Sequence, residues 1–182
     1  MDELVDILDA NGQYTGKTAL KSDAHRQGLF HPTVHIWFYT PMGKVLVQQR
    51  GKDKQTHPLL WDVSVAGHIG AGEDILKAAV REVQEEIGME IEETQLEKIG
   101  VFKSVQQHGV DLIDCEFHHT FICELTLPFS TLTKQESEVE ALKMIPLLQL
   151  AEELWGLANP QKYVPHKTSY YKAVIGAIKL RL

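Results

Sequence analysis

The stretch from Gly67 to Met89 constrains the fold of this 182-residue chain more than any other part of the sequence. It opens with a glycine-rich loop and continues into a segment with helical periodicity. Gly88 stands where the C-terminal cap of that helix is expected. Apolar side chains at i, i+4, i+7 and i+11 fall on one face of the helix, and we expect this face to pack against a core. The apolar positions are Leu76, Val80, Val83 and Ile87.

Three glutamates crowd one face of the same predicted helix. Glu82, Glu85 and Glu86 stand at i, i+3 and i+4, so their carboxylates lie close together beside the apolar stripe. Like charges at this spacing repel one another and weaken an isolated helix, a cost that a bound cation would remove. Clustered carboxylates suit hard ions such as Mg²⁺, which proteins usually share with substrate phosphates. The alternative is an ordinary solvated face, since glutamate-rich helices are common.

The whole stretch resembles the Nudix box, G-x5-E-x7-R-E-U-x-E-E-x-G-U, in which U is a bulky apolar residue. Every fixed position is filled, which makes the resemblance highly specific. It implies that Glu82, Glu85 and Glu86 bind Mg²⁺ or Mn²⁺, with the carbonyl of Gly67 as a further ligand. It also implies that Arg81 holds one of these glutamates through a charge-assisted hydrogen bond. The matching residues are Gly67, Glu73, Arg81, Glu82, Val83, Glu85, Glu86, Gly88 and Met89.

The same resemblance implies a reaction. Bound ions would neutralise a diphosphate, orient a water molecule and lower its pKa, and a glutamate would take the proton of that water. The sequence leaves open which glutamate is the base. Glu73 is expected at the start of the helix, where its charge suits the helix dipole and its side chain serves as a structural cap.

A second resemblance extends from His25 through Glu116, to the Nudix branch that contains type I isopentenyl-diphosphate isomerase and its hydrolase relatives. That isomerase binds diphosphate with an arginine and a lysine before the box. Arg50 and Lys54 match them in spacing, which makes them candidate substrate-binding residues. The isomerase also has a second metal site of histidines and downstream carboxylates. The residues near the matching positions are His25, His31, His68, Asp114 and Glu116, with His25 about one residue out of register.

Two departures separate the chain from the isomerase. The isomerase has an essential cysteine directly before the box glycine, where this chain has Ala66, and its glutamate cluster is degraded, whereas here it is complete. Hydrolysis is therefore favoured over isomerisation. Asp114 and Glu116 share one face of a predicted strand, and of the two we expect Glu116 to reach the metal centre. Whether the three histidines form a second metal site stays open, because scattered histidines are more often packed or solvated.

The remainder of the chain is rich in strands, so the sequence predicts a layered α/β domain. Residues 4–8 and the turn signal at Asn11-Gly12 predict an N-terminal hairpin. Pro146 is expected to open a helix that reaches Trp155. The resemblance implies a Nudix-type α/β/α sandwich with a mixed central sheet, and we expect residues 1–182 to form a single domain. Other strands are predicted at 34–40, 45–49, 61–65, 97–105, 111–127 and 139–145, and the apolar face of a C-terminal helix at Tyr171, Val174, Ile175, Ile178 and Leu182.

Composition and charge limit the classes of function. Hydrophobic residues make up 43% and charged residues 24%, as in ordinary globular proteins. A net charge of −7 speaks against a general nucleic-acid binder, although bound cations would still let an acidic protein take a phosphate substrate. Neither a signal peptide nor a membrane-spanning apolar run is visible. Cys115 and Cys123 are expected to be buried rather than paired. We therefore expect a cytoplasmic protein that binds no membrane.

The expected protein is a metal-dependent Nudix hydrolase that acts on a small-molecule diphosphate. A nucleoside di- or triphosphate is the leading substrate class, followed by a nucleotide sugar and an isoprenoid diphosphate. The alternatives are an isomerase, disfavoured by Ala66, and a non-catalytic nucleotide sensor, which would need a broken box. A homodimer is left open. Trp37, Phe38 and Phe102 are candidates for stacking on a base, but a place in the core is favoured for each.

Overall fold

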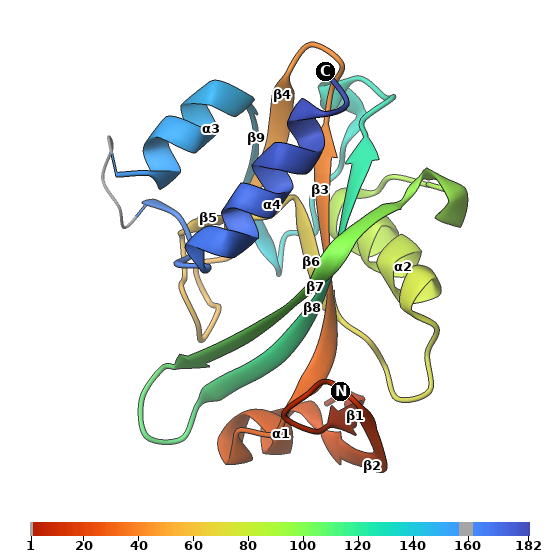
Figure 1. The fold of residues 1–182 in the computed structure, drawn as a ribbon, viewed down its shortest axis with the longest axis vertical. Coiled ribbons are helices and arrows are strands. Elements are labelled where there is room, and N and C mark those ends of the chain that lie inside the picture. The colour runs from red at the N-terminus through yellow and green to blue at the C-terminus, as the bar shows by residue number, and fades with distance from the viewer. Residues whose placement is uncertain (1, 157–161) are drawn as a thin grey trace.

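A seven-stranded mixed sheet lies between two layers of helices (Figure 1). The computed structural model of the chain describes residues 2–156 and 162–182. The elements of the sandwich are β3 (His31–Tyr39), β4 (Lys44–Arg50), β5 (Trp61–Asp62), β6 (Val65–His68), α2 (Ile75–Ile87), β7 (Glu97–Gln107), β8 (Ile113–Glu124), β9 (Val139–Pro146), α3 (Leu147–Leu154) and α4 (Thr168–Lys179). The main path of the sheet is β5-β4-β3-β8-β7, with β6 paired to β3 and β9 paired to β4. Strands β3 and β8 run parallel, whereas their other neighbours are antiparallel.

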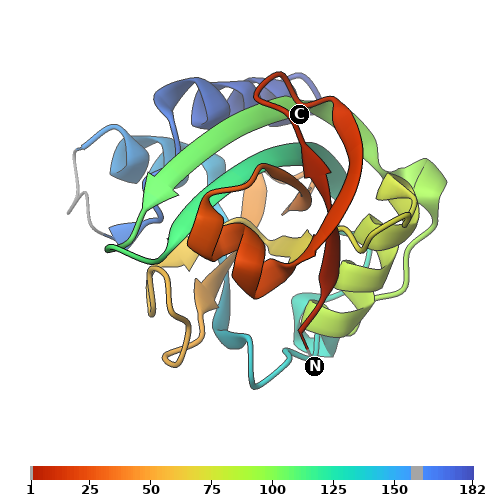
Figure 2. The same cartoon turned by 90° about the horizontal axis from the view of Figure 1, so that it is seen from below.

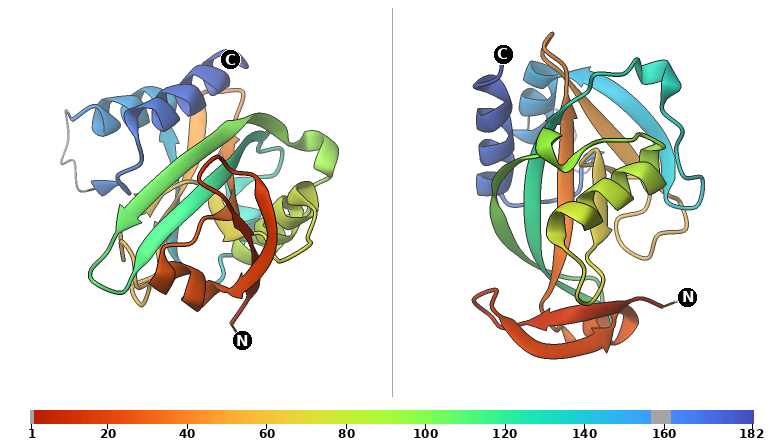
Figure 3. Two further views of the ribbon diagram at one scale, coloured as in Figure 1. Left: turned by 60° about the horizontal axis from the view of Figure 1, so that its bottom comes forward. Right: turned by 90° about the vertical axis from the view of Figure 1, so that its right-hand side faces the viewer.

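Strand β3 is buried on both faces because helices cover both sides of the sheet. Trp37 and Tyr39 point into a core shared with α3 and α4, whereas Ile36 and Phe38 point into a core shared with α2. The two helical layers lie on opposite sides of the sheet in the right-hand view of Figure 3. The α/β/α sandwich with a mixed sheet is confirmed.

The N-terminal hairpin is also confirmed, and it crosses one end of the sheet (Figure 2). It consists of β1 (Leu4–Leu8) and β2 (Tyr14–Leu20). A short helix, α1 (Lys21–Gln27), follows and ends at Gly28 in the left-handed conformation, with φ 62°. No helix is predicted here from the sequence, because α1 is polar and its N-terminus has no side-chain cap. This helix brings His25 close to His31 and His68.

Helix α2 lies where the periodicity predicts it, but its cap differs from the prediction. Asp74, not Glu73, is the N-cap residue, and its carboxylate accepts hydrogen bonds from the backbone N–H groups of Leu76 and Lys77 at 2.9 and 3.2 Å. An aspartate at this position satisfies donors that the helix leaves free. Gly88 ends the helix with φ 66°, as predicted.

The strand predicted at 61–65 is in fact two short strands, since β5 pairs with β4 and β6 pairs with β3. Ser64 lies between them, and its side chain makes hydrogen bonds to neighbouring strands in place of backbone ones. Its Oγ accepts from the Phe38 N–H at 2.8 Å and donates to the Leu46 carbonyl at 2.5 Å. The switch of partner places β6 beside β3 and leads the chain into the box loop.

The C-terminal part agrees with the sequence except at the last residue. Helix α3 begins after Pro146 and has Trp155 as its C-cap. Helix α4 ends at Lys179, so Leu182 lies beyond it and is 54% exposed, contrary to the prediction that it shares the buried face. Cys115 and Cys123 are buried and free, as predicted. None of the described helices is long and apolar enough to cross a membrane.

Candidate functional site

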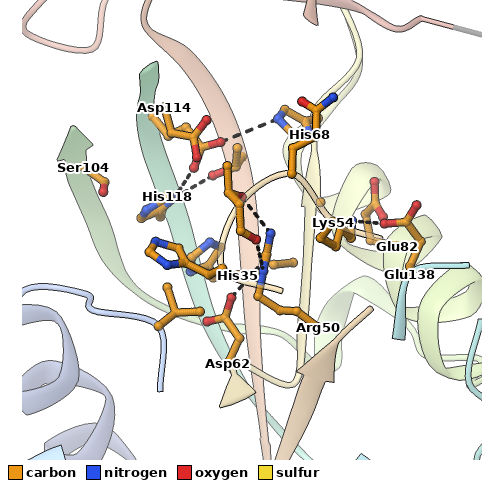
Figure 4. A pocket seen from close by; sticks show the side chains of 18 of the residues that line it. His35, Arg50, Lys54, Asp62, His68, Glu82, Ser104, Asp114, His118 and Glu138 are labelled. Atoms are coloured by element: carbon orange, nitrogen blue, oxygen red, sulfur yellow. Dashed lines mark hydrogen bonds and ion pairs between the residues drawn. The ribbon is translucent and has the colours of Figure 1, made fainter. Parts of the chain in front are cut away.

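A cavity of about 490 Å³ opens between one end of the sheet, helix α2, and the loop that follows β4 (Figure 4). Its floor is formed by side chains at alternate positions of β3 and β8, because alternate residues of a strand share one face. His31 lies opposite Glu116, and Thr33 lies opposite His118 in the parallel ladder. The lining residues on these two strands are Thr33, His35, Asp114, Glu116 and His118, and His31 is buried beside Glu116.

All three box glutamates lie at this cavity. Glu82 and Glu86 are buried, and Glu85 is exposed. Burial raises the pKa of Glu82, while burial and the neighbouring Glu82 together raise the pKa of Glu86 to about 8. Gln48 and the Ala66 N–H donate to the same oxygen of Glu86, at 2.9 and 3.2 Å. Buried carboxylates that stand this close fit a divalent cation, which would compensate their charge.

Arg81 fixes the glutamate cluster by contacting several carboxylates at once. Its Nε and Nη2 donate to the two oxygens of Glu73, both at 2.9 Å. Its Nη1 donates to Glu82 at 2.7 Å and to Glu85 at 3.1 Å, and Nη2 also donates to the His68 carbonyl at 3.0 Å. Glu73 therefore orients Arg81, and through it the glutamates, instead of capping the helix.

Gly67 lies so close to Glu82 that any other residue at this position would displace the Glu82 carboxylate. A Cβ atom at position 67 would stand 1.9 Å from the carboxyl carbon of Glu82. The fixed glycine of the box thus has a steric reason in this chain, since the β6 backbone and the Glu82 carboxylate occupy adjoining space.

A second candidate metal-binding group lies on the floor of the cavity. His25, His31, His68 and Glu116 each offer one ligand atom, and these atoms all lie within 4.8 Å of one another. Glu116 Oε1 is 3.5 Å from His31 Nε2 and 3.6 Å from His68 Nε2. The Nε2 atoms of the three histidines are buried, and none has a hydrogen-bond partner among the described residues. Despite its offset in sequence, His25 joins this group because α1 carries it there.

The orientation of His31 and the charge of Glu116 also suit a cation. His31 Nδ1 lies 2.9 Å from the carbonyl of Leu29 and donates to it, which leaves Nε2 free to act as a ligand. Although burial acts to raise the pKa of Glu116, the adjacent imidazoles of His31 and His68 hold it well below its usual range. Asp114 stays outside the group of four and contacts His108 at 3.0 Å. The chemistry of these four residues, three imidazoles and one carboxylate, fits a divalent transition metal.

The two candidate diphosphate ligands, Arg50 and Lys54, line the cavity opposite the floor. Arg50 is held by the carbonyl and hydroxyl oxygens of Thr56, both at 3.0 Å, and by Asp62 at 3.3 Å. Lys54 forms an ion pair with Glu138. Arg50 is thus rigidly placed, whereas the charge of Lys54 is balanced within the protein.

The sequence reasoning missed a polar wall that continues the floor of the cavity and consists of Thr33, His35, Asp62, His118 and His166. His118 Nδ1 pairs with the hydroxyl of Thr33 at 2.8 Å, and burial lowers the pKa of His118 to about 4. Asp62 is buried and accepts from His166 at 2.9 Å. The rings of His35 and His118 stack with centroids 4.0 Å apart. Alternation along 31–35 and 114–118 could have revealed part of this wall, but nothing in the sequence links it to Asp62 and His166.

The three aromatic residues weighed as base-stacking candidates belong to the core. Trp37 and Phe38 are fully buried, and Phe102 packs against the cluster around Trp37. None of them lines the cavity.

Comparison with known proteins places this site in a family. The family model described as the NUDIX domain matches residues 29–167. An uncharacterized Nudix hydrolase of Clostridium acetobutylicum is 32% identical over 97% of both chains. Nudix hydrolase 3 of Arabidopsis thaliana is 36% identical over 80% of this chain, which corresponds to 19% of the plant protein. An isopentenyl-diphosphate Delta-isomerase of Serratia proteamaculans is 35% identical over 67% of this chain and 66% of its own length.

Solved structures agree on the fold. The protein DR0079 from Deinococcus radiodurans has a TM-score of 0.66 and 20% identity, and the match covers 85% of this chain and 90% of that one. The chain belongs to the Nudix family and is an enzyme of the Nudix hydrolase class. The predicted branch is confirmed as well, since the relatives include both Nudix hydrolases and isopentenyl-diphosphate isomerases.

Proposed function

We propose that the chain hydrolyses a diphosphate bond in a nucleoside di- or triphosphate or another diphosphate-linked small molecule, and that it depends on a divalent cation. The observation that carries this proposal is the complete glutamate cluster of α2, which lies in one cavity with a fixed arginine, Arg50. Carboxylates on one wall and a guanidinium on another match the needs of a diphosphate that is bound together with cations.

Two groups of residues would hold the cations, for which Mg²⁺ or Mn²⁺ is the expected choice. The first is the box cluster of Glu82, Glu85 and Glu86 with the carbonyl of Gly67. The second consists of Glu116 together with His25, His31 and His68. When bound, the cations neutralise the diphosphate and lower the pKa of the attacking water.

The side chains of the protein would do the rest of the work. Arg81 keeps Glu82 and Glu85 in position, because it donates to both. A glutamate of the cluster accepts the proton of the attacking water. Arg50 would donate to the diphosphate with the guanidinium edge that Thr56 and Asp62 leave free, and Lys54 would exchange its contact with Glu138 for a phosphate oxygen.

An isomerase-like activity is the second candidate, because some of the relatives are isopentenyl-diphosphate isomerases and the three histidines and Glu116 lie together. Ala66 argues against it, since a methyl group can neither donate nor accept the proton that moves in an allylic isomerisation. We therefore expect no isomerised product from isopentenyl diphosphate, with NMR as the measurement. Product from the wild-type protein would replace the hydrolase proposal with the isomerase.

The hydrolase proposal is tested by a phosphate-release screen over a panel of diphosphate compounds. We expect activity with Mg²⁺ or Mn²⁺ and none after chelation with EDTA. Activity that persists in EDTA would contradict the role given to the glutamate cluster.

A further inference from the structure

The polar wall of the cavity limits which chemical group the substrate carries beyond its diphosphate. Among the described lining residues, the apolar side chains are those of Ala66, Leu112 and Val164, and no phenylalanine, tyrosine or tryptophan is present. A five-carbon prenyl group would therefore meet hydrogen-bonding groups that it cannot satisfy, and burying such groups without partners is unfavourable.

His118 supplies the most specific observation. Its side chain is only 4% exposed, and its Nδ1 pairs with the hydroxyl of Thr33 at 2.8 Å. Its Nε2 is buried and has no hydrogen-bond partner among the described residues, although the residue lines the cavity. Buried polar atoms are rarely left unpaired. A ligand that carries a hydrogen-bonding group would supply the missing partner.

Two side chains of β7 extend this wall on the side of β8. Ser104 lies opposite Glu116 in the ladder, and Gln106 lies opposite Asp114. Gln106 Oε1 contacts His57 Nε2 at 2.7 Å, which fixes the amide. A serine hydroxyl both donates and accepts. Figure 4 shows Ser104 and His118 on neighbouring strands, with the stacked ring of His35 next to His118.

We propose that His118, Ser104 and Gln106 form a hydroxyl-binding subsite, so that the substrate is the diphosphate ester of a small hydroxylated group such as a sugar or polyol. This inference rests on the proposed diphosphate hydrolysis. The absence of a benzene or indole platform among the described lining residues disfavours an arrangement in which a nucleobase stacks at this end. A cavity of about 490 Å³ that also holds a diphosphate leaves room for a small group.

Three probes separate the sources of the hydroxyl groups. The first is 5-phosphoribosyl 1-diphosphate, which carries a sugar without a base. The second is ADP, whose sugar carries a base, and the third is isopentenyl diphosphate, which has no hydroxyl group. With Mg²⁺, we expect kcat/KM to be at least about tenfold higher for the best hydroxylated probe than for isopentenyl diphosphate, since one good hydrogen bond is worth this factor. A preference for ADP would identify ribose within a nucleotide as the source.

Variants then test the subsite itself. Ser104→Ala and His118→Phe should lower kcat/KM for the hydroxylated probe about tenfold and leave isopentenyl diphosphate unchanged or improved. Val105→Ala is the matched control, because Val105 lies on the same strand but points to solvent and is 53% exposed. Binding is measured in parallel by calorimetry with Mg²⁺ in a Glu86→Gln background, where slow turnover does not consume the probe.

The outcomes distinguish this inference from the proposed function. Equal kcat/KM for isopentenyl diphosphate and both hydroxylated probes would overturn the subsite and leave the hydrolase intact. Loss of both probe classes to the same extent in Ser104→Ala and His118→Phe would also overturn it, because a merely structural role has that effect. If no diphosphate is hydrolysed, the proposed function fails, and binding then decides the subsite: an affinity for the hydroxylated probes no greater than that for isopentenyl diphosphate would reject it.

Discussion

The two candidate metal-binding groups of this protein lie in one cavity but are built in opposite ways. Glu82, Glu85 and Glu86 come from a single helix, and their spacing follows from the helical repeat alone. The histidine group draws its four members from α1, β3, β6 and β8. The first group therefore exists wherever the helix forms, whereas the second exists only after the sheet and the N-terminal hairpin have docked.

The largest expected effect comes from the glutamate group. Glu85→Gln and Glu86→Gln should each lower kcat by about a hundredfold or more, because each removes a charge from the proposed metal site. Steady-state kinetics with Mg²⁺ measures the effect, and Glu90→Gln, just past the end of the helix and exposed, is the control. Near-wild-type turnover in both cluster variants would remove the basis for treating this group as the catalytic one.

His68→Gln removes one of the four residues of the histidine group. We expect the affinity of this group for Mn²⁺ to fall at least about tenfold, so that the titration detects one bound Mn²⁺ fewer. Calorimetric titration with Mn²⁺ gives both numbers. His119→Gln is the matched control, since His119 lies on β8 but faces away from the cavity towards Lys98. An unchanged stoichiometry in His68→Gln would show that only the glutamates bind metal.

Arg50 lies across the cavity from the floor, and replacing it tests whether this side of the cavity binds the substrate. Arg50→Ala should lower kcat/KM about tenfold, the size of one lost charge-assisted hydrogen bond, with a much smaller effect on thermal stability. Arg50→Lys is informative because it keeps the charge but not the fork that contacts Thr56 and Asp62. If kcat/KM is unaffected in Arg50→Ala, the residue only anchors the loop.

The smallest expected effect is a selective weakening of metal binding at the histidine group, which depends on docking of the N-terminal hairpin and α1. Val5 is fully buried between the hairpin and α1, in the small core that includes Ala24. Val5→Ala should loosen α1 and weaken Mn²⁺ binding at the histidine group about fivefold, as a docking penalty of about 1 kcal/mol would, while the glutamate group stays unchanged. Val101→Ala, at an exposed position of β7, serves as control. Equal weakening at both groups would contradict their independence.

The same contrast explains how far the sequence could predict this protein. Helix α2 and the glutamate face were predictable because every residue that defines them lies within one local period. The strands were found from β-branched and aromatic runs, but the break at Ser64 was not, because it depends on contacts with Leu46 and Phe38 from other strands. Asp62 and His166 stand 104 positions apart and meet only in the folded chain. The N-cap was misassigned because Glu73 and Asp74 are adjacent acids, and their roles differ only in the turn geometry.

The parallel register of β3 and β8 determines which side chains of β8 face the cavity. A shift of β8 by a single residue would keep its backbone hydrogen bonds with β3 but turn Cys115, Phe117 and His119 towards the cavity in place of Asp114, Glu116 and His118. Insertions in the turn at 108–112 would leave this register untouched, whereas a deletion within β8 that shifts the strand by one residue would exchange the candidate metal-binding surface for a largely apolar one. The protein could then remain folded and still lose its reactivity altogether, so stability alone is a poor guide to which length variants of this strand stay active.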